Sequence, residues 1–224
     1  MNPSSIQFDS ALLAVGHFKS FPAMTPFVGV DYINTNHSKL LILGESFYFP
    51  EESILHKEPS TWYASSQASL NDEEISHFNC RELLECEWKS DGHKMYREIN
   101  RCLEEVGVTA SERAISHICF TNTFMRPARD PGGSFMHCCS RQDIEISIDV
   151  LTKIINAVTP EMVIFSSVFS WNTVGKTLEK QIQGTCFDFV SHPTDPFHWN
   201  VESYPNGRKK FISLLEKWSK VCSN

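Results

Sequence analysis

The sequence predicts an α/β fold: a three-layer α/β/α sandwich with a central, mainly parallel sheet of four strands. Two observations predict it. Short apolar runs typical of buried strands alternate along the chain with longer stretches in which apolar residues recur at helical spacing. Each apolar run also ends at polar residues of the kind that begin a loop. At 224 residues the chain is long enough for one core, and we expect a single domain over 1–224.

The first strand of the predicted core is Lys39–Leu43, which carries four consecutive aliphatic residues before the polar turn Gly-Glu-Ser. Such a run is typical of a strand buried on both faces. The preceding segment, 1–38, is rich in Phe and Pro, and we expect it to pack on the sheet as a lead-in with a short strand around Val28–Tyr32. Residues 49–70 look irregular, and Trp62-Tyr63 is a candidate aromatic lid.

Two helices are expected next. The acidic turn at 71–74 favours a helix start, with Ile75, Phe78 and Leu83 on the inner face. A second helix ends at Gly107, because glycine commonly stops a helix. The apolar residues of that second helix follow helical spacing: Met95, Ile99, Cys102, Leu103 and Val106.

The second strand is predicted over Ala114–Phe120, and a long loop from Thr123 to Ser140 follows it. The residues 140–143 have the pattern of a capping box and start a helix. The apolar stripe of that helix consists of Ile144, Ile148, Leu151, Ile155 and Val158. The third strand is Met162–Phe165.

The remaining chain predicts one more strand between two helices. Val174, Leu178 and Ile182 mark a helix that closes at Gly184, and Thr185–Val190 is the fourth strand. The last helix follows Asn206-Gly207 and turns five apolar residues inward: Phe211, Leu214, Leu215, Trp218 and Val221.

Composition and charge favour an ordinary globular protein. The hydrophobic and charged contents are 41% and 21%, and no apolar run approaches the ~20 residues of a membrane helix. The N-terminus lacks a basic segment followed by an apolar one, so we expect a cytoplasmic protein without a membrane partner. The net charge of −7 argues against broad, non-specific affinity for nucleic acid, which depends on Lys and Arg neutralising phosphates.

The eight cysteines form no C-x-x-C pair, and we expect reduced thiols. This scatter does not favour a metal site or an iron–sulfur cluster, and no cofactor is predicted. The cysteines stand at positions 80, 86, 102, 119, 138, 139, 186 and 222.

Polar side chains follow the end of each predicted core strand. Because the carboxyl ends of parallel strands share one edge of the sheet, we expect these groups to meet there. A carboxylate can orient or deprotonate a water, an amide can read the edge of a planar heterocycle, and an imidazole can stabilise charge on a leaving group. The groups are Glu45, Ser46, Asn122, Ser166, Ser167, His192 and Thr194.

Each of the three principal residues also has a simpler interpretation. Glu45 would then be an exposed loop acid, and Asn122 a turn former. His192 would be a cap before a proline. These alternatives stay open at the level of the single residue.

The order of these motifs resembles the uracil-DNA glycosylase superfamily over about residues 28–222. Gly-Glu-Ser-Phe-Tyr at 44–48 is similar to the G-Q-D-P-Y or G-E-A-P-G turn after the first core strand, and His-Pro-Thr at 192–194 is similar to the family's His-Pro-Ser. The run from Phe120 to Pro127 resembles the segment of the iron–sulfur-binding branch that begins with Thr-Asn and ends with Arg-Pro, with three residues between Asn122 and Arg126 here. Fold alone does not establish activity.

The resemblance implies roles for individual residues. Glu45 would position the attacking water, Asn122 would contact the base, and His192 would donate toward the pyrimidine oxygen as the glycosidic bond breaks. The wider base-binding set is Gly44, Ser46, Phe47, Tyr48, Asn122, Ser167 and Thr194, with Phe47 or Trp62 as the stacking aromatic and Tyr48 discriminating against a methyl group. The candidates for DNA contact are Arg126, Arg129, Phe197 and Trp199, the last two as wedges.

This sequence departs from the family pattern at several points, one of which is Thr194 in place of the serine of His-Pro-Ser. Ser46 replaces the acid of G-Q-D-P-Y, Phe47 replaces the turn proline, and the cysteines that would hold a cluster are missing upstream of Gly44. The implied activity is hydrolysis of the N-glycosidic bond of uracil or another modified base in DNA, as in base excision repair.

Two other functions remain open. The first is a non-catalytic member of the same fold that binds a free nucleobase, a nucleotide or nucleic acid. The second is a serine esterase, because Gly44-Glu45-Ser46 resembles the Gly-Asp-Ser opening of a lipase-like group, with Ser46 attacking and His192 as base. That group places an Asp three residues before its His, where this chain has Phe189.

Overall fold

The computed structural model of the protein describes residues 4–33, 37–108, 113–200 and 207–220. Within them, the chain forms an α/β fold around one five-stranded sheet of order β1-β3-β2-β4-β5, which confirms the predicted fold class. Four neighbouring strands are parallel, and β1 pairs antiparallel with β3 at one edge. The strands are β1 (Phe27–Val28), β2 (Leu40–Gly44), β3 (Ile118–Asn122), β4 (Met162–Phe165) and β5 (Cys186–Phe189).

All four strands expected for the core are present, and β1 adds a fifth. It occupies the start of the stretch predicted as Val28–Tyr32 and ends earlier, because the chain turns after Val28 and the Tyr32 N–H bonds the Gly29 carbonyl at 3.1 Å. The prediction that the second strand begins at Ala114 is wrong. Ala114–His117 is a buried 3-10 helix (η5), since β2 begins at Leu40 opposite Ile118 and offers no earlier partner.

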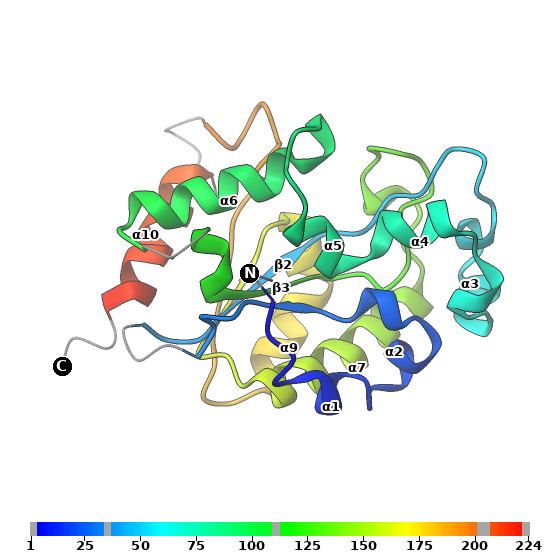
Figure 1. Cartoon of the computed structure of the whole chain (residues 1–224), viewed down its shortest axis with the longest axis horizontal. Helices are drawn as coiled ribbons and strands as arrows, with labels where there is room; N and C mark the ends of the chain where they lie inside the picture. Colours follow the sequence, from blue (N-terminus) through cyan, green and yellow to red (C-terminus); the bar gives the residue numbers. More distant parts are fainter. Residues whose placement is uncertain (1–3, 34–36, 109–112, 201–206, 221–224) are drawn as a thin grey trace.

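The central strand β2 is buried along its whole length and pairs with β3 on one side and β4 on the other. Helices cover both faces of the sheet, as an uninterrupted aliphatic strand requires. In Figure 1, α6 (Lys94–Glu105) and α10 (Arg208–Lys220) lie on one side of the strands, and α7 (Arg141–Val158) and α9 (Lys176–Gln181) lie on the other.

The connection between β2 and β3 contains most of the remaining helices. Three short ones, η2 (Leu55–Lys57), α3 (Pro59–Ala64) and η3 (Gln67–Ser69), occupy the stretch that looked irregular. The helices α4 (Asp72–Phe78) and α5 (Cys80–Glu85), the 3-10 turn η4 (Asp91–His93) and then α6 follow. Asn71 and Glu74 form a capping box on α4, and α6 ends before Gly107, whose φ of +86° favours glycine.

Trp62 is part of the core, so the prediction of a lid or a base-stacking role for it is wrong. Its side chain is fully buried, stacks on Phe21 at 4.4 Å between ring centroids, and donates its indole N–H to the Met125 carbonyl at 2.9 Å. Phe21 belongs to the N-terminal lead-in, where α1 (Asp9–Leu12), α2 (Gly16–Ser20) and η1 (Pro22–Met24) precede β1. A cluster of aromatic side chains therefore joins the lead-in to the β2–β3 connection.

The helix α7 begins at the predicted capping box, in which Ser140 and Asp143 bond each other's backbone N–H groups. Its buried face differs from the prediction in the first two turns. Asp143 and Ser147 are buried there, whereas Ile144 and Ile148 are half-buried. The helix is rotated in this way because Asp143 is held by a buried arginine. On α10, the predicted Val221 lies outside the described residues.

None of the helices in the described part of the chain has both the length and the apolar character that a membrane span needs.

Candidate functional site

The candidate site lies where the chain changes direction across the sheet. From β2 the chain passes to β3 on one side, and from β3 it crosses back to β4 on the other side of β2. Ligands of open α/β sheets bind at the carboxyl ends of the strands at such a switch point. A cavity of about 730 Å³ opens there. Seven predicted site residues line it: Glu45, Ser46, Phe47, Tyr48, Asn122, His192 and Thr194.

The Glu45 carboxylate is held by three hydrogen bonds. Its Oε1 accepts from the Phe135 backbone N–H at 2.7 Å and from the Ser134 hydroxyl at 3.0 Å. Its Oε2 accepts from the Ser167 hydroxyl at 2.5 Å, a bond that joins the ends of β2 and β4. A carboxylate offers about four acceptor positions. One position on Oε2 therefore stays available to a water or to positive charge in the cavity.

Ser134 and Phe135, which the sequence interpretation missed, lie on the loop before α7. Phe135 is fully buried and stacks on Phe124 at 4.2 Å between ring centroids. Phe124 in turn donates its backbone N–H to the Glu45 carbonyl at 3.0 Å. The loop and the turn after β2 are thus fixed to each other, and Glu45 is held in one orientation.

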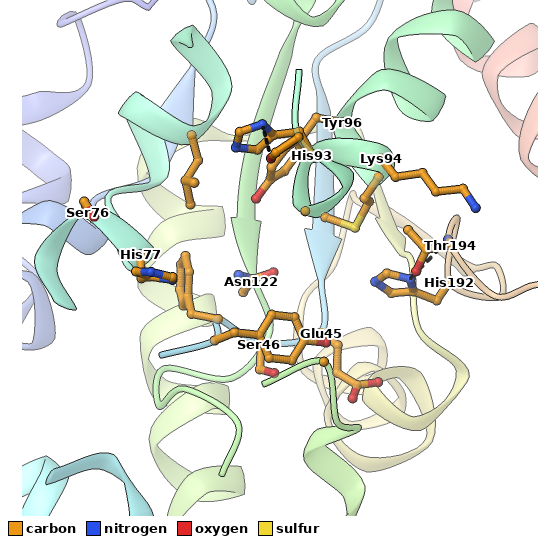
Figure 2. Close-up of a pocket in the computed structure, with 17 residues that line it drawn as sticks. Glu45, Ser46, Ser76, His77, His93, Lys94, Tyr96, Asn122, His192 and Thr194 are labelled. Atoms are coloured by element: carbon orange, nitrogen blue, oxygen red, sulfur yellow. Dashed lines mark hydrogen bonds between the residues drawn. The ribbon is translucent and has the colours of Figure 1, made fainter. Parts of the chain in front are cut away.

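Asn122 ends β3 and stands opposite Gly44 in the sheet. A Cβ on Gly44 would lie 2.0 Å from the Asn122 Oδ1 atom, so only glycine leaves room for this amide. Asn122 is 3% exposed, and its amide forms no hydrogen bond with any residue in the described ranges. Figure 2 shows it at the centre of the cavity, between His77 and His192. Its donor and acceptor are both available to a ligand.

His192 faces the cavity from the segment after β5. Its Nδ1 lies 2.8 Å from the Thr194 hydroxyl and accepts the Thr194 backbone N–H at 3.3 Å. A backbone N–H can only donate, so Nδ1 is the acceptor and the proton of the neutral ring sits on Nε2. Burial lowers the pKa of His192, and the carboxylates of Glu45 and Asp195 oppose that shift only in part. The ring is therefore a neutral N–H donor at neutral pH.

The turn after Glu45 forms one wall of the cavity. Phe47 is 3% exposed and packs edge-on against Phe78, with 6.5 Å between ring centroids. Tyr48 pairs through its backbone with Ala128 in an isolated parallel bridge. Burial, and next the charge of Glu45, raise the pKa of Tyr48, so its hydroxyl stays protonated.

The serine-esterase arrangement is not assembled. Within the described residues, the buried Ser46 hydroxyl has no hydrogen-bond partner, and the His192 Nδ1 that would face an acid bonds Thr194 instead. The two nearby acids contact other groups: Asp188 accepts from Lys210 at 2.5 Å, and Asp195 from His198 at 2.7 Å.

Arg126 and Trp199 cannot contact DNA, and both predictions are wrong. The Arg126 guanidinium is fully buried and forms a bidentate pair with Asp143 through bonds of 2.8 and 2.7 Å. Trp199 is 2% exposed and donates its indole N–H to Glu98 at 3.0 Å. Phe197, which is 75% exposed, and the exposed Arg129 remain as candidates.

The sequence interpretation also missed the cavity wall opposite the strand ends. That wall comes from α4, α5, η4 and α6, and its residues carry no motif. Met95 was expected only as a core residue of its helix. The members are Ser76, His77, Leu83, Ser90, Gly92, His93, Lys94, Met95 and Tyr96.

Within the described residues, no group of three His, Cys, Asp or Glu side chains comes together that could hold a metal ion. The seven cysteines in those ranges are free thiols.

Comparison of the chain with models of known protein families and with curated proteins gives no match. The resemblance to the glycosylase superfamily therefore rests on the short motifs at 44–48, 120–127 and 192–194.

Proposed function

We propose that the protein hydrolyses the N-glycosidic bond of uracil or another modified base in DNA. The observation that carries the proposal is the set of groups around one cavity. An oriented carboxylate (Glu45), an unpartnered amide (Asn122) and a neutral imidazole (His192) reach it from the ends of three different strands or the segments that follow them. A cavity of about 730 Å³ is within the usual range for a small-molecule site.

In the proposed reaction the target nucleotide leaves the duplex, which costs a few kcal/mol and least at a mismatch. The Asn122 amide hydrogen-bonds the polar edge of the base. As the bond between the sugar carbon and the base nitrogen breaks, its electron pair goes to the base, and the His192 Nε2–H stabilises that negative charge.

The sugar develops the character of an oxocarbenium ion, as in other glycosyl hydrolysis. Glu45 stabilises that cation and orients a water with the free acceptor position on Oε2. The water oxygen bonds the sugar carbon, and the proton that the water loses passes to the Glu45 carboxylate.

A second candidate is a non-catalytic protein that binds a free nucleobase or nucleotide in the same cavity. A charge observation favours it. Among the described residues that line the cavity, Lys94 is the single Lys or Arg, and Arg126 is withdrawn into the core. Affinity for a DNA backbone depends on such residues.

The test is base release from oligonucleotides that carry uracil, hypoxanthine or alkylated bases. We expect Glu45→Gln and His192→Ala each to slow release by about 10²–10³, the usual cost of losing one such group. Glu51→Gln is the control, because Glu51 is an exposed acid of the same connection and is absent from the cavity lining. Equal release by the parent and both site variants would overturn the assigned roles. Stabilisation of the parent by free bases without release would select the binding protein.

A further inference from the structure

The cavity is larger than a single pyrimidine requires. An apolar cavity of roughly 150 Å³ holds one benzene ring, whereas this one measures about 730 Å³. The groups assigned to hydrolysis line only the side at the strand ends. In Figure 2, Tyr96 and His93 lie across the cavity from Glu45 and Ser46, with Asn122 between them. The space beside the helices is therefore left without an assigned occupant.

The helical wall (Leu83, His93, Met95 and Tyr96) has an apolar body with polar ends. Leu83 and Met95 present aliphatic and thioether groups, and the Tyr96 ring packs edge-on against Phe120 at 5.4 Å between centroids. Covering this surface with a flat apolar group is favourable, because apolar area is removed from water.

Two polar side chains, Tyr96 and Asn122, indicate that a ligand lies between the strand ends and the helical wall. Tyr96 is 7% exposed and Asn122 is 3% exposed, and both line the cavity. Neither the Tyr96 hydroxyl nor the Asn122 amide forms a hydrogen bond with another residue of the described ranges. Both residues line the cavity, and polar side chains that lie there without a protein partner commonly face a ligand or water in native proteins.

The helical wall carries no net charge. Burial raises the pKa of Tyr96, so its hydroxyl is protonated. Burial, with the charge of Arg97, lowers the pKa of His93, and the His93 Nδ1 lies 3.0 Å from the Ser90 hydroxyl. Lys94 is the one Lys or Arg among the described residues that line the cavity, but its side chain is exposed and in Figure 2 extends away from Tyr96 and His93. The wall suits an uncharged group.

We propose that the substrate or ligand of this site is a nucleobase carrying a bulky, uncharged substituent, which lies against the helical wall. The proposal rests on the proposed function only in that a base occupies the strand-end side of the cavity. The base would then meet Asn122 and His192, and the substituent would meet Leu83, Met95 and Tyr96. Unsubstituted uracil would leave the helical wall uncovered.

The test compares the dissociation constants of uracil and phenyl-substituted uracil by calorimetry on the full chain. We expect the phenyl derivative to bind the parent about tenfold more tightly, because the ring is buried against the helical wall. Leu83→Trp fills that space and should abolish the gain. Leu70→Trp, at a half-buried leucine outside the cavity lining, is the matched control.

Equal affinities of the parent for the two compounds would overturn the inference, and so would weaker binding of the phenyl derivative. Because that comparison uses the parent, it stands even where a variant fails to fold. Base release is measured on the same samples, which separates the two proposals. Release of uracil without a gain for the phenyl derivative refutes only this inference. Tighter binding of the phenyl derivative without release of any base refutes only the hydrolysis.

Discussion

Arg126 lies inside the protein, although its place in a surface-like loop with other arginines suggested contact with DNA. Its guanidinium donates to both Asp143 oxygens, to the His56 carbonyl and to the Cys138 carbonyl. These bonds tie the β2–β3 connection, the loop before α7 and α7 itself together. The same loop supplies the donors that hold Glu45, so Arg126 is a positioning residue.

Replacing Arg126 by Leu should lower the free energy of unfolding by about 3–5 kcal/mol, because Asp143 would remain as a buried charge without its partner. Urea denaturation followed by circular dichroism measures the change. Arg129→Leu, at an exposed arginine of the same loop, should stay within about 0.5 kcal/mol of the parent. A small effect for Arg126→Leu would mean that the buried pair contributes little.

The protonation of His192 sets the expected pH dependence of activity. Burial lowers its pKa, so the neutral ring persists below the ordinary histidine value of about 6.5. Base release should therefore stay level as the pH falls from about 8 to 6.5 and decline only below that, as the imidazolium forms. A pH profile of the release rate measures it, and a decline centred above 6.5 would contradict a neutral donor.

At the scale of elements, a strand was predicted correctly where its own residues are enough to identify it. The aliphatic run of β2 requires burial on both faces, whatever its neighbours are. The length of β3 depends on where β2 begins, so the apolar residues of η5 were misread as strand. Likewise Ser140 and Asp143 gave the start of α7, but the bond from Asp143 to Arg126, seventeen residues away, was not visible in any local pattern.

The same limit applies to the candidate site. Glu45, Asn122 and His192 were expected together because parallel strands end at one edge of a sheet. The helical wall depends on how the 72–105 segment packs across that edge, and no spacing in the segment encodes it.

The capping boxes that begin α7 and α4 should contribute differently to the stability of the protein. Ser140→Ala should lower the free energy of unfolding by about 1 kcal/mol, because the long helix α7 loses its first-turn bond. Asn71→Ala on the short, exposed α4 should instead speed hydrogen exchange locally, with a smaller change in global stability. Urea denaturation and amide exchange of both variants measure this. Equal global losses would show that α4 unfolds together with the core.

At the scale of the whole molecule, both the net charge of −7 and the pairing of surface cations weaken the affinity for a phosphate backbone. Several cations are already paired on the surface: Arg81 with Asp9, and Arg208 with Glu98 and Glu105. Among the described residues that line the cavity, Lys94 is the one Lys or Arg that could hold a phosphate. The recognition that we propose therefore depends on the cavity and the base within it more than on the surface around it.

The central claim is that a base lies between Asn122 and a neutral His192. Nuclear magnetic resonance of the imidazole nitrogens tests it most directly, because the chemical shifts of the two ring nitrogens show which of them carries a proton. His192 is one of nine histidines in the chain, so its signals are assigned first. Near neutral pH we predict that His192 carries its proton on Nε2 and that this signal shifts on saturation with the nucleobase, but not in Asn122→Ala. A doubly protonated His192, or a signal that the nucleobase leaves unchanged, would contradict the claim.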